Sequence, residues 1–192
     1  MKLLILGSRD FAQTVVALTL DCGHEPCGFV DDFHKDGEII GDSDSIQHSH
    51  PPHDFGVAIA IGYNNLPARW HAWQKLQRAG YAAPALIHPR AYVASGAQLG
   101  DGTMVMAGAI VDVRACLGEI VVAWPGACVN HDARIGSNSF LSPNATICGH
   151  AQIGASCFIG AAAAIVDHAD VPDDTFVPMS GRWNHRCVGA RT

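Results

Sequence analysis

A histidine and an aspartate stand side by side in the segment Val129–Asp132, and they are the residues of this 192-residue chain that most clearly could do chemistry. Imidazole takes up a proton near neutral pH, so His131 is a candidate general base for an amine or hydroxyl nucleophile. The carboxylate of Asp132 could hold the tautomer of the ring and raise its basicity, as in a catalytic triad. The pair therefore predicts acid–base chemistry. The alternative is a surface corner that simply carries polar residues.

The pair lies within a strict six-residue repeat. Fourteen unbroken hexads run from Val93 to Phe176, and thirteen of their fourteen first positions are Val, Leu or Ile. The fifth position is small in every hexad but that of Val121. A period of six fits a coil of three short strands, stacked at about 4.8 Å per coil. We therefore predict a parallel β-helix with an 18-residue coil, in which stacking buries an aliphatic column and glycines at the second position fit crowded corners.

Counting in steps of 18 residues extends the candidate site. Gly149 lies one coil after His131, and His150 lies one coil after Asp132. A glycine leaves the corner above His131 without a side chain, so an accessible backbone N–H there could serve as an oxyanion donor. We expect His150 and His168 to line the same groove, with surface decoration as the alternative.

The first 88 residues follow a different pattern, in which short apolar runs alternate with helical ones. We predict strands at Lys2–Leu6, Pro26–Val30 and Phe55–Ile61 and helices at Asp10–Cys22 and Leu66–Ala79, the last capped by Asn64 or Asn65, and Ala85–Ile87 is expected to lead out of the domain. This order is typical of a Rossmann-like βαβ, doubly wound α/β domain. The expected organisation is an α/β domain over residues 1–88, followed by the β-helix and a tail over residues 89–192.

The turn after the first predicted strand lacks the full glycine fingerprint of a dinucleotide site, because Arg9 follows Gly7 and Ser8 where a second glycine is needed. NAD is therefore not expected. Asp31 and Asp32 end the next strand, at an edge where doubly wound sheets commonly hold a ligand. Their carboxylates could accept hydrogen bonds from a ribose or a base. The alternative is that these aspartates only cap a turn.

The composition narrows the class of protein. The formal net charge is −6 and there is no basic run, which argues against a nucleic-acid partner. The chain has no apolar stretch of about 20 residues that would span a bilayer, and its opening is too short for a signal peptide. Seven cysteines without paired spacing suit reduced thiols. We expect a cytoplasmic protein that does not insert into membranes.

The hexad array, the His131–Asp132 pair, the leading βαβ unit with Asp31 and Asp32, and the run Ile61–Asn65 together resemble a known family. They are similar to bacterial sugar O- and N-acetyltransferases of the left-handed β-helix, or hexapeptide-repeat, NeuD/PglD type. The resemblance implies left-handed coiling and a homotrimer. It also implies acetyl-CoA as co-substrate in the groove between adjacent prisms, no metal, and a small sugar acceptor.

The resemblance also implies roles for individual residues. His131 would be the general base, Asp132 its orienting partner, and the Gly149 N–H the contact for the thioester carbonyl. The positions expected to contact the cofactor are His150, Gly160, Ala161, Ala164 and Arg182, with Arg186 as a further candidate for the CoA phosphates. The positions expected to contact the acceptor are Gly7, Ser8, Arg9, Asp31, Asp32, Asn64 and Trp124. Trp124 departs from the family pattern and supplies an aromatic face.

The preferred reading is acetyl transfer from acetyl-CoA to the amine of a nucleotide-linked amino sugar by direct attack. Acetylation of a hydroxyl on sialic acid or another glycan is an alternative, and a non-catalytic hexapeptide-repeat scaffold is another, since the repeat alone is a structural device. A three-histidine zinc site is not expected, because Gly149 and Gly136 stand where further imidazoles would be needed. The histidine-rich segment Gln47–His53 is expected to be an exposed loop.

Overall fold

The computed structural model describes residues 1–35 and 37–185. The chain divides into two compact units, Met1–Leu86 and Ile87–Thr192, and each is described by itself. Within the described ranges, every helix is too short or too polar to cross a membrane.

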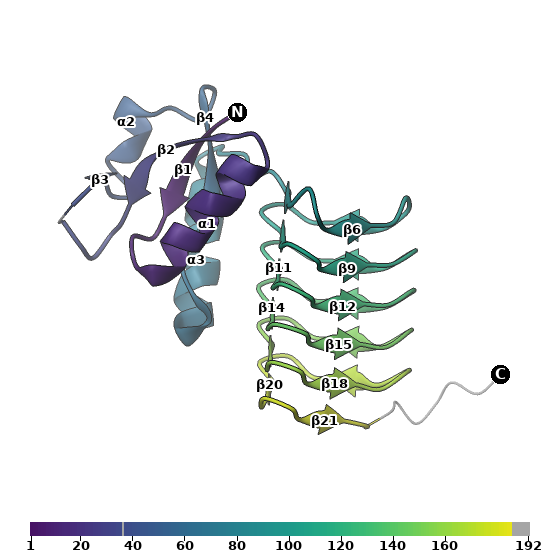
Figure 1. Ribbon diagram of the computed structural model, residues 1–192. Helices are drawn as coiled ribbons and strands as arrows, with labels where there is room; N and C mark the ends of the chain where they lie inside the picture. The colour runs from purple at the N-terminus through teal and green to yellow at the C-terminus, as the bar shows by residue number, and fades with distance from the viewer. Residues whose placement is uncertain (36, 186–192) are drawn as a thin grey trace. The chain divides into compact units, whose positions relative to one another are not determined.

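The first unit is built on a four-stranded parallel sheet with the strand order β3-β2-β1-β4 (Figure 1). Its elements are β1 (Lys2–Leu6), α1 (Asp10–Asp21), β2 (Glu25–Val30), β3 (Ile39–Gly41), α2 (Ile46–Ser49), β4 (Phe55–Ile59), the 3-10 turn η1 (Tyr63–Asn65) and α3 (Leu66–Arg78). The core consists of the inner strands with apolar residues of the helices, such as Val15 of α1 and Trp73 of α3. The strand order places the carboxyl ends of β1, β2 and β4 at one edge.

The predicted elements of this unit are present, with ends that differ by one or two residues, and β4 ends at Ile59 rather than at Ile61. The side chain of Asn65 caps α3, accepting a hydrogen bond from the Ala68 N–H at 3.1 Å. Strand β3 and helix α2 were not predicted. The expectation of a loop over the histidine-rich segment is therefore partly wrong, because α2 covers its first half and the ring of His50 packs edge-on against Phe55.

The second unit is a prism of three parallel sheets, drawn in teal to yellow in Figure 1. One sheet contains β5 (Leu86–Ile87), β8 (Met104–Val105), β11 (Val122–Ala123), β14 (Phe140–Leu141), β17 (Phe158–Ile159) and β20 (Phe176–Val177). The next contains β6 (Tyr92–Val93), β9 (Ile110–Val111), β12 (Cys128–Val129), β15 (Thr146–Ile147), β18 (Ala164–Ile165) and β21 (Arg182–Trp183). The third contains β7 (Gln98–Leu99), β10 (Cys116–Leu117), β13 (Arg134–Ile135), β16 (Gln152–Ile153) and β19 (Asp170–Val171).

Each strand of the prism pairs with the strand one coil later, so that Val129 of β12 lies opposite Ile147 of β15 in the parallel ladder. The predicted 18-residue coil is thereby confirmed. First-position residues point inward and form a continuous apolar column, and the small fifth-position residues lie beside them. Val121, the exception to the small-residue rule, is fully buried.

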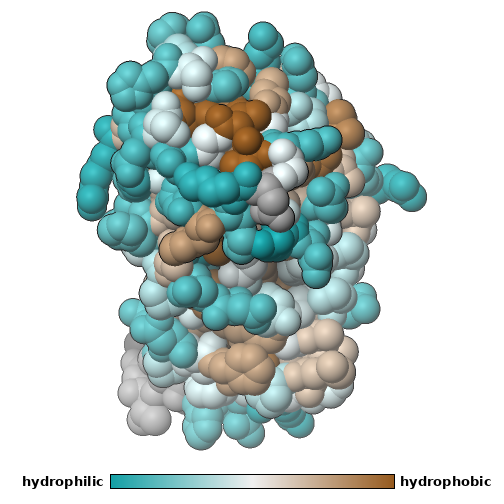
Figure 2. Space-filling view, turned by 90° about the vertical axis from the view of Figure 1, so that its left-hand side faces the viewer, coloured by the Kyte–Doolittle hydropathy of each residue, from teal (hydrophilic) through white to brown (hydrophobic). Residues whose placement is uncertain are grey.

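The surface in view in Figure 2 is mostly hydrophilic, and patches of apolar residues interrupt it. Exposed large apolar side chains occur in both units, with Phe33 in the first and Phe176 and Met179 in the second. Most of the apolar side chains lie inside the sheets and the prism.

The corners of the prism have two distinct backbone requirements. The fourth position of each hexad, from Gly96 to Ser180, lies in the left-handed region, and several of these residues are not glycine. The second-position glycines are required for a different reason, because successive coils approach each other closely at these positions. A Cβ added at Gly136 would lie 2.5 Å from the Gly154 carbonyl carbon and 2.5 Å from the Ala155 nitrogen. No L side chain fits there unless the coils separate.

We predict that Gly136→Ala destabilises the prism by about 1–3 kcal/mol, because overpacking against backbone cannot be relieved by a side-chain rotation. Thermal or denaturant unfolding of the second unit measures the effect. Ala162→Gly is the matched control, since Ala162 has a φ of 54° that glycine adopts more readily. It should change the stability by no more than about 1 kcal/mol. Equal stability of Gly136→Ala and the wild type would contradict the close-approach explanation.

Candidate functional site

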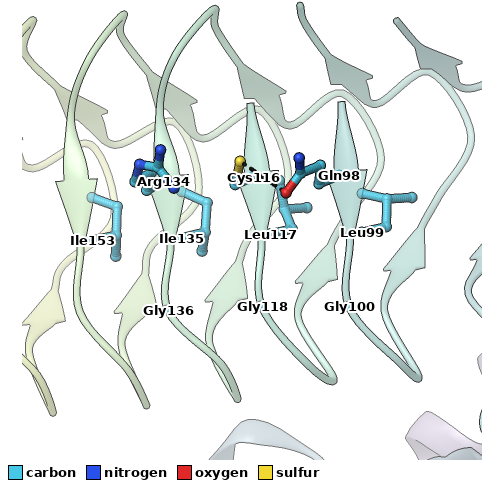
Figure 3. A pocket seen from close by; sticks show the side chains of 10 residues that line it. All are labelled: Gln98, Leu99, Gly100, Cys116, Leu117, Gly118, Arg134, Ile135, Gly136 and Ile153. Atoms are coloured by element: carbon cyan, nitrogen blue, oxygen red, sulfur yellow. Dashed lines mark hydrogen bonds between the residues drawn. The ribbon is translucent and has the colours of Figure 1, made fainter. Parts of the chain in front are cut away.

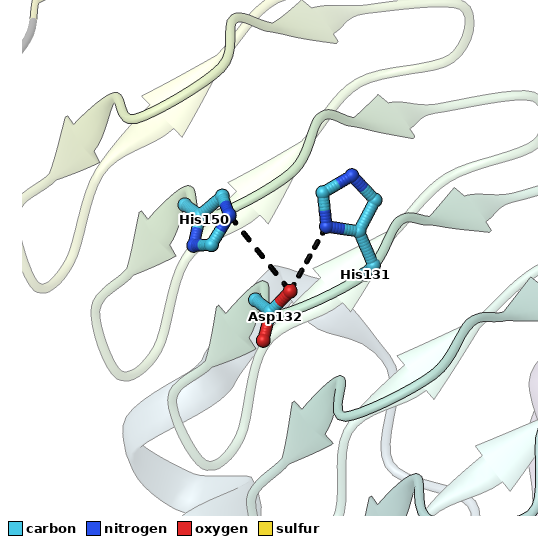
Figure 4. Close-up of side chains that lie close together, drawn as sticks. All are labelled: His131, Asp132 and His150. Carbon is cyan, nitrogen blue, oxygen red and sulfur yellow. Dashed lines mark hydrogen bonds and ion pairs between the residues drawn. The ribbon is translucent and has the colours of Figure 1, made fainter.

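The corner between β12 and β13 brings His131 and Asp132 into contact (Figure 4). The Nδ1 atom of His131 lies 2.9 Å from Oδ2 of Asp132. The His131 side chain is 48% exposed and that of Asp132 is 22% exposed, so the ring can meet a ligand while the carboxylate is more protected. Asp132 has a φ of 60°, a left-handed conformation that aspartate tolerates better than most residues.

Arg114, one coil earlier, holds the same carboxylate with both arms of its guanidinium. Its Nε donates to Asp132 Oδ1 at 2.7 Å and its Nη2 donates to Oδ2 at 2.8 Å. The hydrogen bond from Arg114, followed by that from His131, holds the pKa of Asp132 well below its usual range. An ionised carboxylate only accepts hydrogen bonds, so in a neutral His131 ring Nδ1 carries the proton and Nε2 has the lone pair. Arg114 was not predicted from the sequence, although it lies 18 residues, or one coil, before Asp132.

Gly149 lies directly against the ring of His131. A Cβ at Gly149 would be 2.7 Å from Cε1 and 2.9 Å from Nε2 of His131, so any side chain there would displace the imidazole. Gly149 is itself buried, and its carbonyl oxygen accepts a hydrogen bond from the His168 N–H at 3.0 Å. The corner is therefore occupied by the ring rather than open as expected. An oxyanion role for the Gly149 N–H stays a prediction.

His150 and His168 continue the corner toward the later coils. Nε2 of His150 lies 3.8 Å from Asp132 Oδ2, and its ring meets that of His131 edge-on with centroids 5.3 Å apart. The ring of His168 stacks on that of His150 at 4.6 Å. His150 therefore belongs to the same cluster as the His131–Asp132 pair. In the described part of the chain, His131, Asp132 and His150 are the group whose ligand atoms converge enough to hold a metal ion.

The remaining candidates of the second unit lie elsewhere on the coil. Gly160 and Ala161 form the corner between β17 and β18, and Trp124, two coils earlier, shares the column of Gly160. Ala164 of β18 pairs with Arg182 of β21, on the sheet that separates this corner from the one that carries His131. Within one chain the structure thus does not bring Trp124 to the His131 corner. Arg186 lies outside the described residues.

In the first unit, Asp31 collects hydrogen bonds at the carboxyl end of β2. Its Oδ2 accepts from Ser8 Oγ at 2.6 Å, and its Oδ1 accepts from the Phe33 and His34 N–H groups at 2.9 and 3.0 Å. Burial alone would raise the pKa of Asp31, but these bonds, led by the one from Ser8, lower it to about 2. Arg9 reaches the same cluster through its Nε, 3.2 Å from His34 Nε2.

Asp32 and Gly7 also have internal partners. Both oxygens of Asp32 accept from Ser43, through its N–H at 2.7 Å and its hydroxyl at 2.8 Å. Gly7 has a φ of 111°, and a Cβ there would lie 2.8 Å from the carbonyl oxygen of Ala60, the residue after β4. A side chain at position 7 would therefore collide with this backbone. Asn64 is exposed on η1. The aspartates thus fit the turn-capping alternative in this structure, and their contact with a ligand stays a prediction.

A shallow groove crosses the sheet of β7, β10, β13 and β16 (Figure 3). Gly100, Gly118 and Gly136 leave one side of it bare, and Arg134 is the one charged residue among those that line it. Two of the lining residues contact each other, because Cys116 Sγ donates to Gln98 Oε1 at 3.7 Å. The lining offers no acid–base pair comparable with His131 and Asp132.

Comparisons with known proteins match both units. The PglD N-terminal domain model matches residues 2–74, and the model for the bacterial transferase hexapeptide (six repeats) matches residues 132–166. The acetyltransferase domain of PglB from Neisseria gonorrhoeae is 26% identical, with 96% of this chain and 92% of that chain covered and a TM-score of 0.88. No curated protein sequence matches the chain.

Over both units the chain is similar to the left-handed β-helix sugar acetyltransferases of the NeuD/PglD type. The PglB domain in complex with acetyl coenzyme A is 27% identical to this chain, with 92% and 95% of the two chains covered and a TM-score of 0.73. PerB from Caulobacter crescentus, in complex with CoA and GDP-perosamine, shares the fold at 23% identity, with 93% and 94% covered and a TM-score of 0.71. The expected fold class and the expected resemblance to this family are thereby confirmed.

We predict that the Asp31 cluster makes the stability of the first unit depend on pH. The folded pKa of about 2 lies below the ordinary value of 3.8, so the stabilisation is present above about pH 4 and is lost as the pH falls through about 2. Ser8→Ala should raise the folded pKa of Asp31 and lower the stability at pH 7 by about 1 kcal/mol. NMR titration and denaturant unfolding measure the two effects. Ser49→Ala, which removes the hydroxyl of an exposed serine in contact with Ile46 and His50, is the control.

Proposed function

We propose that this protein transfers the acetyl group of acetyl-CoA to a sugar, with the amine of a nucleotide-linked amino sugar as the acceptor and His131 as the general base. The observation that carries the proposal is the contact between His131 and Asp132, with Arg114 clamping the carboxylate. Acetyl coenzyme A bound to the similar PglB domain supports the choice of acyl donor.

The chemistry follows from the protonation of the pair. As the acceptor nitrogen attacks the thioester carbonyl carbon, Nε2 of His131 takes the proton that this nitrogen loses. Asp132 stays ionised and stabilises the imidazolium through Nδ1–H. The tetrahedral intermediate collapses with cleavage of the carbon–sulfur bond, and the CoA sulfur leaves as a thiol with the proton from His131. No acyl-enzyme is required.

The acyl donor is proposed to contact the small residues Gly160, Ala161 and Ala164. Ala161 and Ala164 are partly exposed, whereas Gly160 is buried and a Cβ there would lie 2.5 Å from the Met179 nitrogen. Arg182 on the neighbouring strand is exposed and could meet a CoA phosphate. His150, in contact range of the pair, is proposed to border the thioester. The Gly149 N–H is retained as the proposed oxyanion donor.

The acceptor is proposed to reach the edge of the first sheet where β1 and β2 end. Arg9 is exposed there, so a phosphate would meet its cationic guanidinium. The hydrogen bond from Ser8 to Asp31 joins the turn that carries Arg9 to the one that carries His34, whose N–H donates to Asp31. This support favours a nucleotide-linked sugar over a free one.

We predict that His131→Ala lowers kcat by about 10² to 10⁴, because general-base catalysis contributes about that much. The assay is release of CoA thiol with a panel of UDP- and GDP-linked amino sugars, free sialic acid and simple amines. His53→Ala, which removes an exposed imidazole of the first unit, is the matched control and should keep the wild-type rate.

Two outcomes would count against the proposal. An unchanged rate in His131→Ala with a productive acceptor would remove His131 from the mechanism. A wild-type melting temperature that does not respond to saturating acetyl-CoA would favour a non-catalytic scaffold. Turnover of free sialic acid alone would change the acceptor and leave the acyl donor in place.

We predict that Arg114→Ala lowers kcat/KM by about two- to fivefold, because an ion pair exposed to solvent is weakened by water and salt. The Arg114 side chain is 65% exposed, so a larger effect is not expected. Arg114→Lys keeps the charge without the two-pronged geometry and should recover part of the loss. Arg134→Ala on β13 removes an exposed arginine outside the corner and should be neutral. Equal rates for all three variants and the wild type would show that the clamp does not matter to catalysis.

A further inference from the structure

The corner of the prism places three metal-ligating groups around one point (Figure 4). His131, Asp132 and His150 each offer one ligand atom, and these atoms lie within 4.8 Å of one another. Two of the separations are 2.9 Å, from His131 Nδ1 to Asp132 Oδ2, and 3.8 Å, from His150 Nε2 to the same oxygen. Two imidazoles and a carboxylate are a donor set that zinc uses in proteins.

The spacing suits a tetrahedral ion. With metal–ligand bonds of about 2.0–2.1 Å, neighbouring ligand atoms in a tetrahedron lie about 3.3 Å apart. The separations of 2.9 and 3.8 Å fall on either side of that value, so modest side-chain rotations bring the atoms into place. Both imidazoles are about half exposed, at 48% and 47%, so an ion can reach them from solvent and a fourth position stays open to water.

The surroundings of the carboxylate fit such an ion as well. Arg114 Nε donates to Oδ1 of Asp132, the oxygen that faces neither imidazole, and Nη2 donates at 2.8 Å to Oδ2, the oxygen that would bind the ion. Metal-ligating carboxylates commonly accept hydrogen bonds from an outer group that fixes their orientation. Arg114 could serve as that outer group while Oδ2 binds the ion. The left-handed conformations of Asp132 and His150, with φ values of 60° and 58°, set both residues at the same corner position of successive coils.

We propose that this corner binds a divalent transition-metal ion of the zinc class through His131 Nδ1, Asp132 Oδ2 and His150 Nε2, and that the bound ion inhibits the protein. The site is an inhibitory one and not that of a catalytic cofactor. Imidazole ligands select zinc, cobalt, nickel or copper over magnesium and calcium, which prefer oxygen. The inhibition rests on the proposed function, whereas the binding does not.

The inhibition follows from the position of one proton. In the metal-free corner, Nδ1 of His131 carries the proton and Nε2 has the lone pair that accepts a proton from the acceptor amine. A metal bound at Nδ1 takes that lone pair, and the neutral ring then carries its proton on Nε2. The ring therefore keeps one proton and stays neutral. Its Nε2 becomes a donor and can no longer act as the base.

The test is a titration of the intact, reduced protein with Co²⁺, whose visible absorption reports a tetrahedral nitrogen–oxygen site, followed by displacement with Zn²⁺. We expect one equivalent to bind to the wild type. His150→Ala should weaken the affinity by at least about tenfold, since outer partners alone are worth about 10- to 100-fold. The matched controls are His48→Ala and His53→Ala, which remove imidazoles of the histidine-rich segment, and they should bind as the wild type does.

An affinity that falls in the His48 or His53 variants and not in His150→Ala would overturn the proposal, as would the absence of a tetrahedral Co²⁺ spectrum in the wild type. Acetyl transfer is assayed separately, with each variant compared with its own metal-free rate. Zinc should inhibit the wild type and inhibit His150→Ala at least about tenfold less strongly. Binding without any acetyl transfer in metal-free protein would leave the site standing and refute the proposed function instead.

Discussion

The hydrogen-bonded stacking of one coil on the next is the constraint on which the rest of the second unit depends. The ladder sets His150 over Asp132 and Gly149 over His131 through bonds such as that from the His150 N–H to the His131 carbonyl at 3.1 Å. The register cannot slip by one residue, because the aliphatic column would then turn outward. Corner residues 18 positions apart therefore have fixed neighbours, and Arg114 takes its place against Asp132 in the same way.

Asp132 is the residue through which these neighbours interact. Its carboxylate accepts from Arg114 on both oxygens and from His131 on one, and His150 lies 3.8 Å away. The guanidinium keeps the carboxylate ionised, which makes it an acceptor for either imidazole. The same guanidinium fixes its orientation, so that Oδ2 lies nearer to His131 than to His150. Arg114 thus decides which of two similar rings receives a fixed tautomer.

The sequence was sufficient for the fold because the repeat is strict, and the α/β pattern of the first unit gave its main strands and helices. Register counting was equally sufficient for Gly149 and His150. Arg114 was not predicted, because it lies 18 residues before Asp132 and counting forward from the pair does not reach it. Within one chain Trp124 lies on another corner of the coil than His131, and its expected contact with the acceptor stays a prediction. The short elements β3 and α2 were missed, since three or four residues carry little periodicity. The internal bonds of Asp32 to Ser43 depend on a turn that no local pattern predicts.

The donor set proposed for the corner differs from the three-imidazole site that the sequence excludes. A three-imidazole site would need histidines in place of Gly136 and Gly149 beside His131, whereas the proposed site uses a carboxylate as one donor. A general base and a metal site need the same thing, a nitrogen lone pair close to other polar groups. What separates them at His131 is whether the proton sits on Nδ1 or on Nε2. Since Nδ1 faces an ionised carboxylate held by Arg114, the metal-free corner keeps its proton on Nδ1 and leaves Nε2 free for acid–base chemistry.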